Sequence, residues 1–187
     1  MLGDDELVDA LISVPRLSHR ALASEQVDLS RMAGEIIRRL QEAEPGRMVD
    51  IAIAPDQVVA GDRAQLKIML EQLLANAWKF SAGKAPARIA FDKEMIADQA
   101  VYAVSDNGVG FDMAYANKLF QIFQRLHLES AFSGIGIGLA MAQRIVRNHG
   151  GEIWGEGVVD QGATFRFTLG AGRPQNPDLG EPKIYAP

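Results

Sequence analysis

The stretch EQLLANAWKFS at 71–81 carries polar side chains at helical spacing. Gln72 and Asn76 are four residues apart, so both amides lie on one face of a helix, and Lys79 follows close behind. An amide oxygen is a ligand that suits Mg²⁺, and a lysine pairs with phosphate charge. The structural alternatives are that Asn76 ends its helix and that Lys79 is a solvated cation.

A glycine-rich run, GIGIGL at 134–139, leads into an apolar helical pattern. A dinucleotide-binding fingerprint follows the first strand and precedes an acidic residue by about 20 positions, and this run lies deep in the chain after a loop. A Walker A loop is excluded because no Gly-Lys-Ser/Thr ends the run. The two readings left are a flexible turn and a loop whose backbone N–H groups bind an anion at a helix N-terminus.

Three more stretches combine residues that bind ligands. SDNGVGF at 105–111 puts Asp106 at the end of a predicted strand, ahead of two glycines. FQIFQRLH at 120–127 holds two phenylalanines and a cation, and GATF at 162–165 leads into the last predicted strand. Each stretch alone is weak evidence for a site.

Three helices are predicted to position these stretches. The first begins at Asp28 or Ser30 and ends at EPG, 44–46, and its apolar face is Leu29, Met32, Ala33, Ile36, Ile37 and Leu40. The second runs from about Asp62 to Ala77 and buries Leu66, Met69, Leu70, Leu73 and Leu74. The third covers about 137–148, which places His149 at a helix C-terminus, where a cation is favoured.

Predicted strands come in pairs between the helices: 47–55 with 57–62, 87–92 with 100–106, and 151–156 with 163–169. Paired strands favour a mixed sheet with helices on one face, an α/β two-layer sandwich, over a doubly wound parallel sheet. A long loop with one short helical patch is expected between 107 and 135, and the proline- and glycine-rich tail at 171–187 is expected to fray.

Composition narrows the class of protein. The 187 residues are 48% hydrophobic and 23% charged and include no cysteine, which suits one cytoplasmic globular domain without disulfides. The net charge of −5 argues against binding to nucleic acid. No apolar run is long enough to span a bilayer, and the acidic N-terminus is unlike a signal peptide.

Taken together, five stretches in this order resemble the ATP-binding domain of bacterial sensor histidine kinases, which has the Bergerat fold shared with Hsp90, DNA gyrase B and MutL. They match its N box (72–80), G1 box (106–110), F box (120–123), G2 box (134–139) and a G3-like GAT (162–164). The residues in these stretches are most similar to those of phytochrome-type histidine kinases. The resemblance implies a catalytic ATP-binding domain over 27–170, preceded at 1–26 by the end of a dimerisation hairpin.

At the adenine end, the resemblance implies that Asp106 accepts a hydrogen bond from the adenine amino group. Gly108 and Gly110 would let the backbone approach the base, and the hydroxyl of Thr164 would complete this end. Phe80 would pack near the nucleotide.

At the phosphate end, the resemblance implies that Asn76 binds Mg²⁺ and that Lys79 and Arg125 meet phosphate charge. Backbone N–H groups of the G2 box would hold the phosphates, through Gly134, Gly136, Gly138 and Leu139. Phe120 and Phe123 would shape a lid over about 112–135. Arg125 has a structural alternative, an ion pair with Glu129.

Two positions depart from the family pattern. Gln72 stands where many members have asparagine, and Glu71 is one position away from where related ATPases hold a general base, about 100° around the helix. Because an amide cannot take a proton at neutral pH, phosphoryl transfer to a protein group is expected in place of rapid ATP hydrolysis. The expected catalytic residues are Asn76, Lys79, Arg125 and, in a polarising role, Gln72.

The front of the chain carries His19 followed by Arg20, where an acceptor histidine is usually followed by an acidic residue. We therefore expect the accepting histidine on a hairpin of the full-length protein or of a partner in trans, with a response regulator as the next acceptor. His127 lies in the expected lid and is not assigned a catalytic role. Two alternatives remain: a serine kinase of the anti-sigma-factor type, and a non-catalytic nucleotide-binding or docking module.

Overall fold

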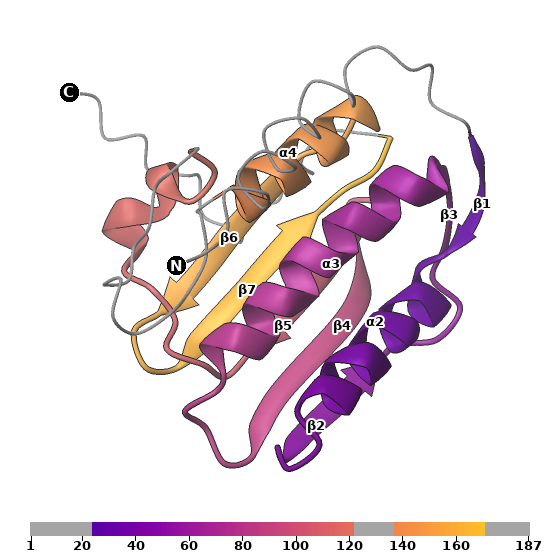
Figure 1. Ribbon diagram of the computed structural model, residues 1–187. Helices are drawn as coiled ribbons and strands as arrows, with labels where there is room; N and C mark the ends of the chain where they lie inside the picture. Colours follow the sequence, from indigo (N-terminus) through magenta and orange to yellow (C-terminus); the bar gives the residue numbers. More distant parts are fainter. Residues whose placement is uncertain (1–23, 122–136, 171–187) are drawn as a thin grey trace, which may run out of the picture.

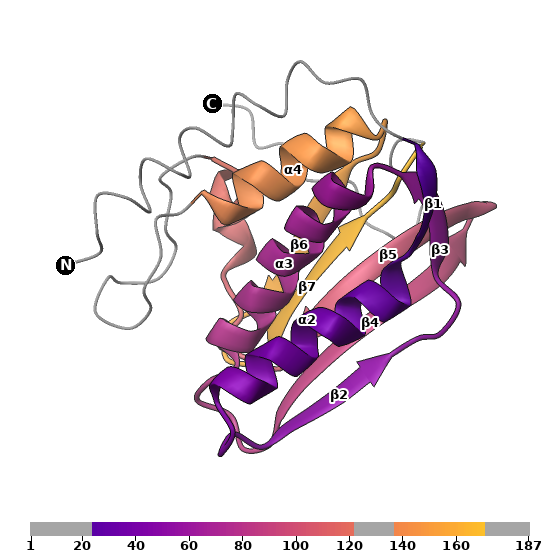
Figure 2. The same ribbon diagram turned by 45° about the vertical axis from the view of Figure 1, so that its right-hand side comes forward.

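The computed structural model describes residues 24–121 and 137–170, which form a sheet covered on one face by helices (Figures 1 and 2). The strand order is β2-β4-β5-β7-β6, with bounds β2 Val49–Ile53, β4 Ala87–Ile96, β5 Gln99–Asp106, β7 Gly162–Phe167 and β6 Ile153–Val158. β2 and β4 pair in parallel, and all other neighbours pair antiparallel. The predicted mixed-sheet α/β sandwich is confirmed.

Three helices form the second layer: α2 (Leu29–Ala43), α3 (Arg63–Phe80) and α4 (Gly138–Asn148). Asp28 caps α2, accepting a hydrogen bond from the backbone N–H of Arg31 at 2.9 Å. Ser30, the other predicted cap, instead donates its hydroxyl to the Ala54 carbonyl at 2.7 Å. α3 is capped by Asp62 and runs three residues past its predicted end at Ala77.

A second, two-stranded sheet lies beside the helix layer and was not predicted. β1 (Glu25–Asp28) pairs antiparallel with β3 (Val58–Gly61), from Glu25 opposite Gly61 to Asp28 opposite Val58. Strands β2 and β3, adjacent in sequence, therefore belong to different sheets. We call the β1–β3 pair the ribbon.

The core fills the space between the sheet and the helices. The five predicted core residues of α3 are all fully buried, and so are Phe91 of β4 and Phe167 of β7. The predicted face of α2 is also buried, with Leu40 partly so. Burial of a leucine side chain contributes about 1.5–3 kcal/mol, so these faces fix how the helices lie on the sheet.

The segment after β5 contains one short 3-10 helix, η1 (Met113–Lys118), within the region predicted as a loop. The remainder of that region, 122–136, lies outside the described residues, as do residues 1–23 of the predicted segment 1–26 and the predicted tail 171–187. Among the helices that are described, none is long and apolar enough to cross a membrane.

Candidate active site

Helices α3 and α4 lie antiparallel, and their contacts determine where the predicted polar residues meet. Near the start of α3, Gln65 Oε1 accepts a hydrogen bond from the Asn148 side chain at the end of α4, at 3.2 Å. Further along α3, the Gln72 amide lies against Gly138, the first residue of α4. Asn76 lies one turn, about 6 Å, further along α3, so it projects from α3 just beyond the N-terminus of α4.

The N-terminus of α4 is a source of positive partial charge. Its N-cap residue, Ile137, makes no side-chain hydrogen bond to the first turn. The N–H groups of a first helical turn have no partner within the helix and favour an anion. The Lys79 ammonium lies 4.6 Å from the centroid of the Phe80 ring, near the end of α3. The C-terminal half of α3 and the first turn of α4 thus carry a cation, an amide and helix N–H groups, kinds of group that suit a phosphate ligand.

The loop after β5 rests on the C-terminal end of α3. The Val109 N–H donates to the Phe80 carbonyl at 3.1 Å, and Gly108 lies so near that a Cβ there would be 2.3 Å from the same oxygen. The Gly108 N–H in turn donates to Asp106 Oδ1 at 2.8 Å. Asp106, Gly108 and Phe80 are thus held together by backbone contacts.

The same loop interlocks with the turn between β6 and β7. Gly110 has φ +59°, and a Cβ there would lie 2.0 Å from the Val158 carbonyl oxygen. Gly162 has φ +113°, and a Cβ there would lie 2.0 Å from the Asp106 carbonyl oxygen. Only glycine fits both the conformation and the space at these two positions.

Asp106 has a perturbed carboxyl group. Burial raises its pKa to about 6, and hydrogen bonds from the backbone N–H groups of Gly108 and Ala163 act in the opposite direction without cancelling it. A partly buried carboxyl with a raised pKa at the edge of a site is a candidate for ligand recognition.

Thr164 does not share the face of the sheet on which Asp106 lies. In the β5–β7 register, Ala163 is opposite Asp106 and Thr164 is opposite Ser105. Side chains alternate between the two faces of a sheet, so Thr164 projects with Ser105 away from the helices. Ala163 is thus the residue opposite Asp106, and its backbone N–H binds the Asp106 carboxyl group.

Two predicted site residues pack into the core. Phe120 makes an edge-to-face contact with Phe165, with ring centroids 6.4 Å apart. Leu139, like Phe120, is partly buried against the core cluster. Both side chains therefore pack against the core beside the site. The other predicted members lie outside the described residues: Phe123, Arg125, Gly134 and Gly136, as do His19 and His127.

Glu71 is directed away from the site, as its helical position predicts. Its carboxylate contacts the Arg39 guanidinium of α2 at 3.1 Å and the Lys67 ammonium at 3.9 Å. It therefore lies on the side of α3 that faces α2, while Gln72 lies on the side that faces α4.

Sequence reasoning missed a cluster that holds the last turn of α3. The Arg47 guanidinium donates to the Trp78 carbonyl at 2.5 Å and to the Ser81 hydroxyl at 3.0 Å, and it lies 4.4 Å from the Trp78 ring centroid. The Trp78 indole N–H donates to Glu44 at 2.9 Å. Arg47 lies between the turn after α2 and the start of β2, and Trp78 and Ser81 are 31 and 34 residues away, so no sequence signal marked the cluster.

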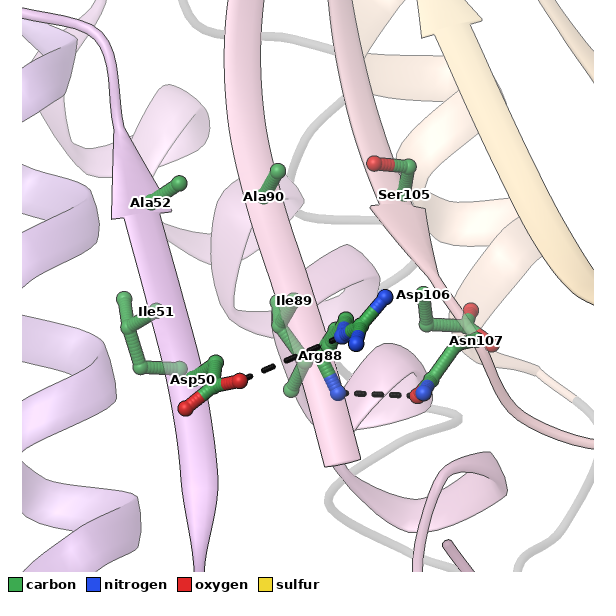
Figure 3. Close-up of a pocket in the computed structure, with 9 residues that line it drawn as sticks. All are labelled: Asp50, Ile51, Ala52, Arg88, Ile89, Ala90, Ser105, Asp106 and Asn107. Carbon is green, nitrogen blue, oxygen red and sulfur yellow. Dashed lines mark hydrogen bonds and ion pairs between the residues drawn. The ribbon is translucent and has the colours of Figure 1, made fainter. Parts of the chain in front are cut away.

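A separate cavity of ≈ 360 Å³ lies at the ends of β2, β4 and β5 (Figure 3). Arg88 crosses it, with an ion pair to Asp50 at 3.9 Å and a backbone N–H that donates to Asn107 at 2.8 Å. Ala90 and Ser105 line it and are cross-strand partners on the face opposite the core. Of the candidate site residues that the structure describes, Asp106 alone lines it, so this cavity is not where those residues converge.

Comparison with known proteins gives consistent matches. A family described as histidine kinase-, DNA gyrase B-, and HSP90-like ATPase matches residues 61–173. Cyanobacterial phytochrome A of Nostoc is 31% identical over 166 residues and cyanobacterial phytochrome B of Nostoc is 34% identical over 173, covering 89% and 88% of this chain. The chain spans 22% of the length of either relative.

A solved structure shares the fold. Full-length ShkA in complex with AMPPNP superposes with a TM-score of 0.72 at 23% identity, over 88% of this chain and 35% of that one. At this identity, the similarity bears on the arrangement of helices and strands alone.

Proposed function

The chain belongs to the family of histidine kinase-, DNA gyrase B- and HSP90-like ATPases, and on this premise we propose that it is the catalytic domain of a sensor histidine kinase. It binds ATP with Mg²⁺ and donates the γ-phosphoryl group to a histidine on a partner hairpin. The observation that carries the proposal is the convergence of three features at one end of the helix layer: the end of α3, the N-terminus of α4 and the Asp106–Gly110 loop.

Asp106 selects the base. Its carboxylate accepts a hydrogen bond from the amino group of adenine, whereas guanine presents a carbonyl oxygen at the same position. Gly108 and Gly110 leave the backbone free of side chains where the base enters. Because the pKa of Asp106 is about 6, the acceptor form predominates at neutral pH.

The ends of α3 and α4 bind the phosphates. The Lys79 ammonium and the first-turn N–H groups of α4 supply positive charge, and Asn76 supplies an amide oxygen to Mg²⁺. The described residues include no group of three or more His, Cys, Asp or Glu side chains that could hold a metal ion. A single protein oxygen still fits Mg²⁺, which takes its other ligands from phosphate and water, and the bound ion would neutralise phosphate charge.

The chain's own residues favour transfer over hydrolysis. Gln72 is an amide and cannot accept a proton, and Glu71 is engaged with Arg39 on the α2 side. Catalysis then consists of positioning the γ-phosphoryl group and screening its charge while a histidine approaches. The response regulator would receive the phosphoryl group from that histidine, in the cytoplasm, where ATP is available.

Within this proposal, residues 27–170 form the catalytic domain, and its first strand, β1, begins two residues earlier, at Glu25. The segment before β1 is the end of a hairpin helix with its linker, and 171–187 is a tail. The phospho-accepting histidine then belongs to a hairpin supplied by the full-length protein or in trans.

The test combines nucleotide binding with transfer. Asn76→Ala and Asp106→Asn are each expected to weaken Mg·ATP binding at least about tenfold, a loss of about 1.4 kcal/mol. Glu71→Gln, on the same helix but facing α2, serves as the matched control and should bind like the wild type. If both site variants bind Mg·ATP like the wild type, the site assignment is wrong.

The transfer arm uses labelled ATP and a supplied histidine-bearing hairpin. The expected product is acid-labile and base-stable, as phosphohistidine is. An acid-stable, base-labile product would support the serine kinase, and binding without any transfer would support a non-catalytic nucleotide-binding module.

A further inference from the structure

We propose that Gln72 is a positioning residue, whose side-chain amide sets how far the N-terminus of α4 stands from α3. This inference rests on the proposed function, because the position of that N-terminus decides where phosphate-binding N–H groups lie relative to Asn76. Gln72 acts through Gly138 and takes no part in proton transfer.

The contact between the two residues is close and specific. A Cβ on Gly138 would lie 2.3 Å from Gln72 Oε1, 3.3 Å from its Cδ and 3.8 Å from its Cβ, and these are the three nearest atoms. The space that a side chain at 138 would need is therefore filled by Gln72. Real Cβ atoms do not approach an oxygen to 2.3 Å, so a side chain at 138 would have to displace the end of the Gln72 side chain.

The length of the glutamine side chain matters for this contact. Asparagine at position 72 would be shorter by one methylene, at most about 1.5 Å. Its amide would no longer reach Gly138, leaving a gap into which α4 can move. The glutamine at position 72, where many family members have asparagine, thus sets the distance between α3 and the N-terminus of α4.

The other end of α4 is held by different contacts. The Asp62 backbone N–H donates to His149 Nε2 at 3.0 Å, and the Asn148 side chain donates to Gln65 at 3.2 Å. The helix has 11 residues and is about 16 Å long. Because its C-terminal end is fixed to α3, a change at Gln72 swings the N-terminal end, where the phosphates bind.

A size exchange between the two positions tests the inference. Gly138→Ala adds a methyl group that displaces the Gln72 amide, whose end is flexible and can move. Gln72→Asn removes the methylene. In the double variant Gln72→Asn/Gly138→Ala, the added methyl group fills the space left by the shorter side chain, which restores the distance between the helices.

The experiment measures dissociation constants for Mg·ATP and for adenosine in the wild type, both single variants and the double variant. Each single variant is expected to weaken Mg·ATP binding about fivefold, and the double variant to return to within about twofold of the wild type. Adenosine binding should be the same in all four, because adenosine reaches only the Asp106 end. Single-variant losses that multiply in the double variant, or equal losses for adenosine, would overturn the inference.

A second measurement does not depend on nucleotide. In the nucleotide-free wild type, nuclear Overhauser contacts are expected between the side-chain protons of Gln72 and the α protons of Gly138. Their absence overturns the positioning role. If these contacts are present while the wild type binds neither ATP nor adenosine, the proposed function fails and the positioning of α4 by Gln72 stands.

Discussion

The two ends of the candidate site are both built on glycine, but the glycines do different things. At the adenine end, Gly110 and Gly162 have positive φ, and a Cβ on either would meet a backbone carbonyl at 2.0 Å. At the phosphate end, Gly138 faces the tip of a flexible side chain. Backbone cannot move aside at low cost, whereas a side-chain amide can. The adenine end is therefore fixed by the fold, and the phosphate end is adjustable.

This difference suits the two parts of a nucleotide. A base is a rigid plane that needs a preformed slot, and such slots gain affinity because little has to be ordered on binding. The phosphates must be placed relative to an incoming acceptor, and a side-chain contact allows that placement to be tuned.

Gly162→Ala tests whether the adenine end is fixed by the fold, and it has the largest expected effect. The added methyl group meets the Asp106 carbonyl oxygen, and alanine is strained at φ +113°, so we expect a loss of about 3 kcal/mol or more in the free energy of unfolding. Urea denaturation measures it. Gly34→Ala is the matched control: it lies inside α2 with open space around it and should stabilise the protein by about 0.5–1 kcal/mol. A Gly162→Ala loss under about 1 kcal/mol would mean that this end adapts.

Arg47→Ala tests what holds the α3 end of the site. It removes two hydrogen bonds from a charged donor and the stacking on Trp78, so we expect a loss of about 2–3 kcal/mol. The melting temperature and the affinity for Mg·ATP should both fall. Arg38→Ala, an exposed arginine of α2 paired with Glu42, should cost no more than about 0.5 kcal/mol. Equal effects of the two substitutions would show that the cluster is not needed.

The pH dependence of stability tests the buried carboxyl of Asp106. Its pKa in the folded protein, about 6, lies above the ordinary value of 3.8, so its contribution is fully present below pH 3.8 and is lost as the pH rises through 6. Relative to Asp106→Asn, the wild type should lose about 2 kcal/mol of unfolding free energy between pH 4 and pH 7. Urea titrations across this range measure the difference. Parallel curves for the two proteins would contradict the raised pKa.

The smallest effect is expected for the same glycine substitution at the phosphate end. Gly138→Ala should change the free energy of unfolding by less than about 1 kcal/mol, because the Gln72 amide can move and alanine favours a helix. Comparing its urea midpoint with that of Gly162→Ala measures the contrast directly. Similar losses at both positions would remove the distinction between a fixed and an adjustable end.

Much of the fold could be predicted because apolar periodicity reports which side of an element is buried. The faces of α2 and α3 and six of the seven described strands, β2 to β7, followed from it. Strand β1 escaped notice because its four residues end at Asp28, which is also the cap of α2. The pairing of the strands could not be predicted from the sequence either, since β2 and β3 are neighbours in sequence and belong to different sheets.

For the site, the sequence motifs predicted the elements on which five residues lie: Asn76, Lys79, Asp106, Gly108 and Gly138. The face on which Thr164 lies could not be predicted, because it depends on the register of β7 with β5. The role of Arg47 depends on a contact across 31 residues with Trp78, which a single sequence does not reveal.

The ribbon has a structural consequence for the helix layer. β1 runs straight into α2 through Asp28, β3 runs into α3 through Asp62, and His149 ties the end of α4 to the same Asp62 backbone. The Leu29 N–H also donates to the Gln57 carbonyl beside β3. One end of each of the three helices is thus connected to the ribbon, outside the main sheet. The ribbon therefore lies at one end of α3 and α4, and the proposed phosphate-binding groups, Asn76 and the first turn of α4, lie toward the opposite ends of the same two helices.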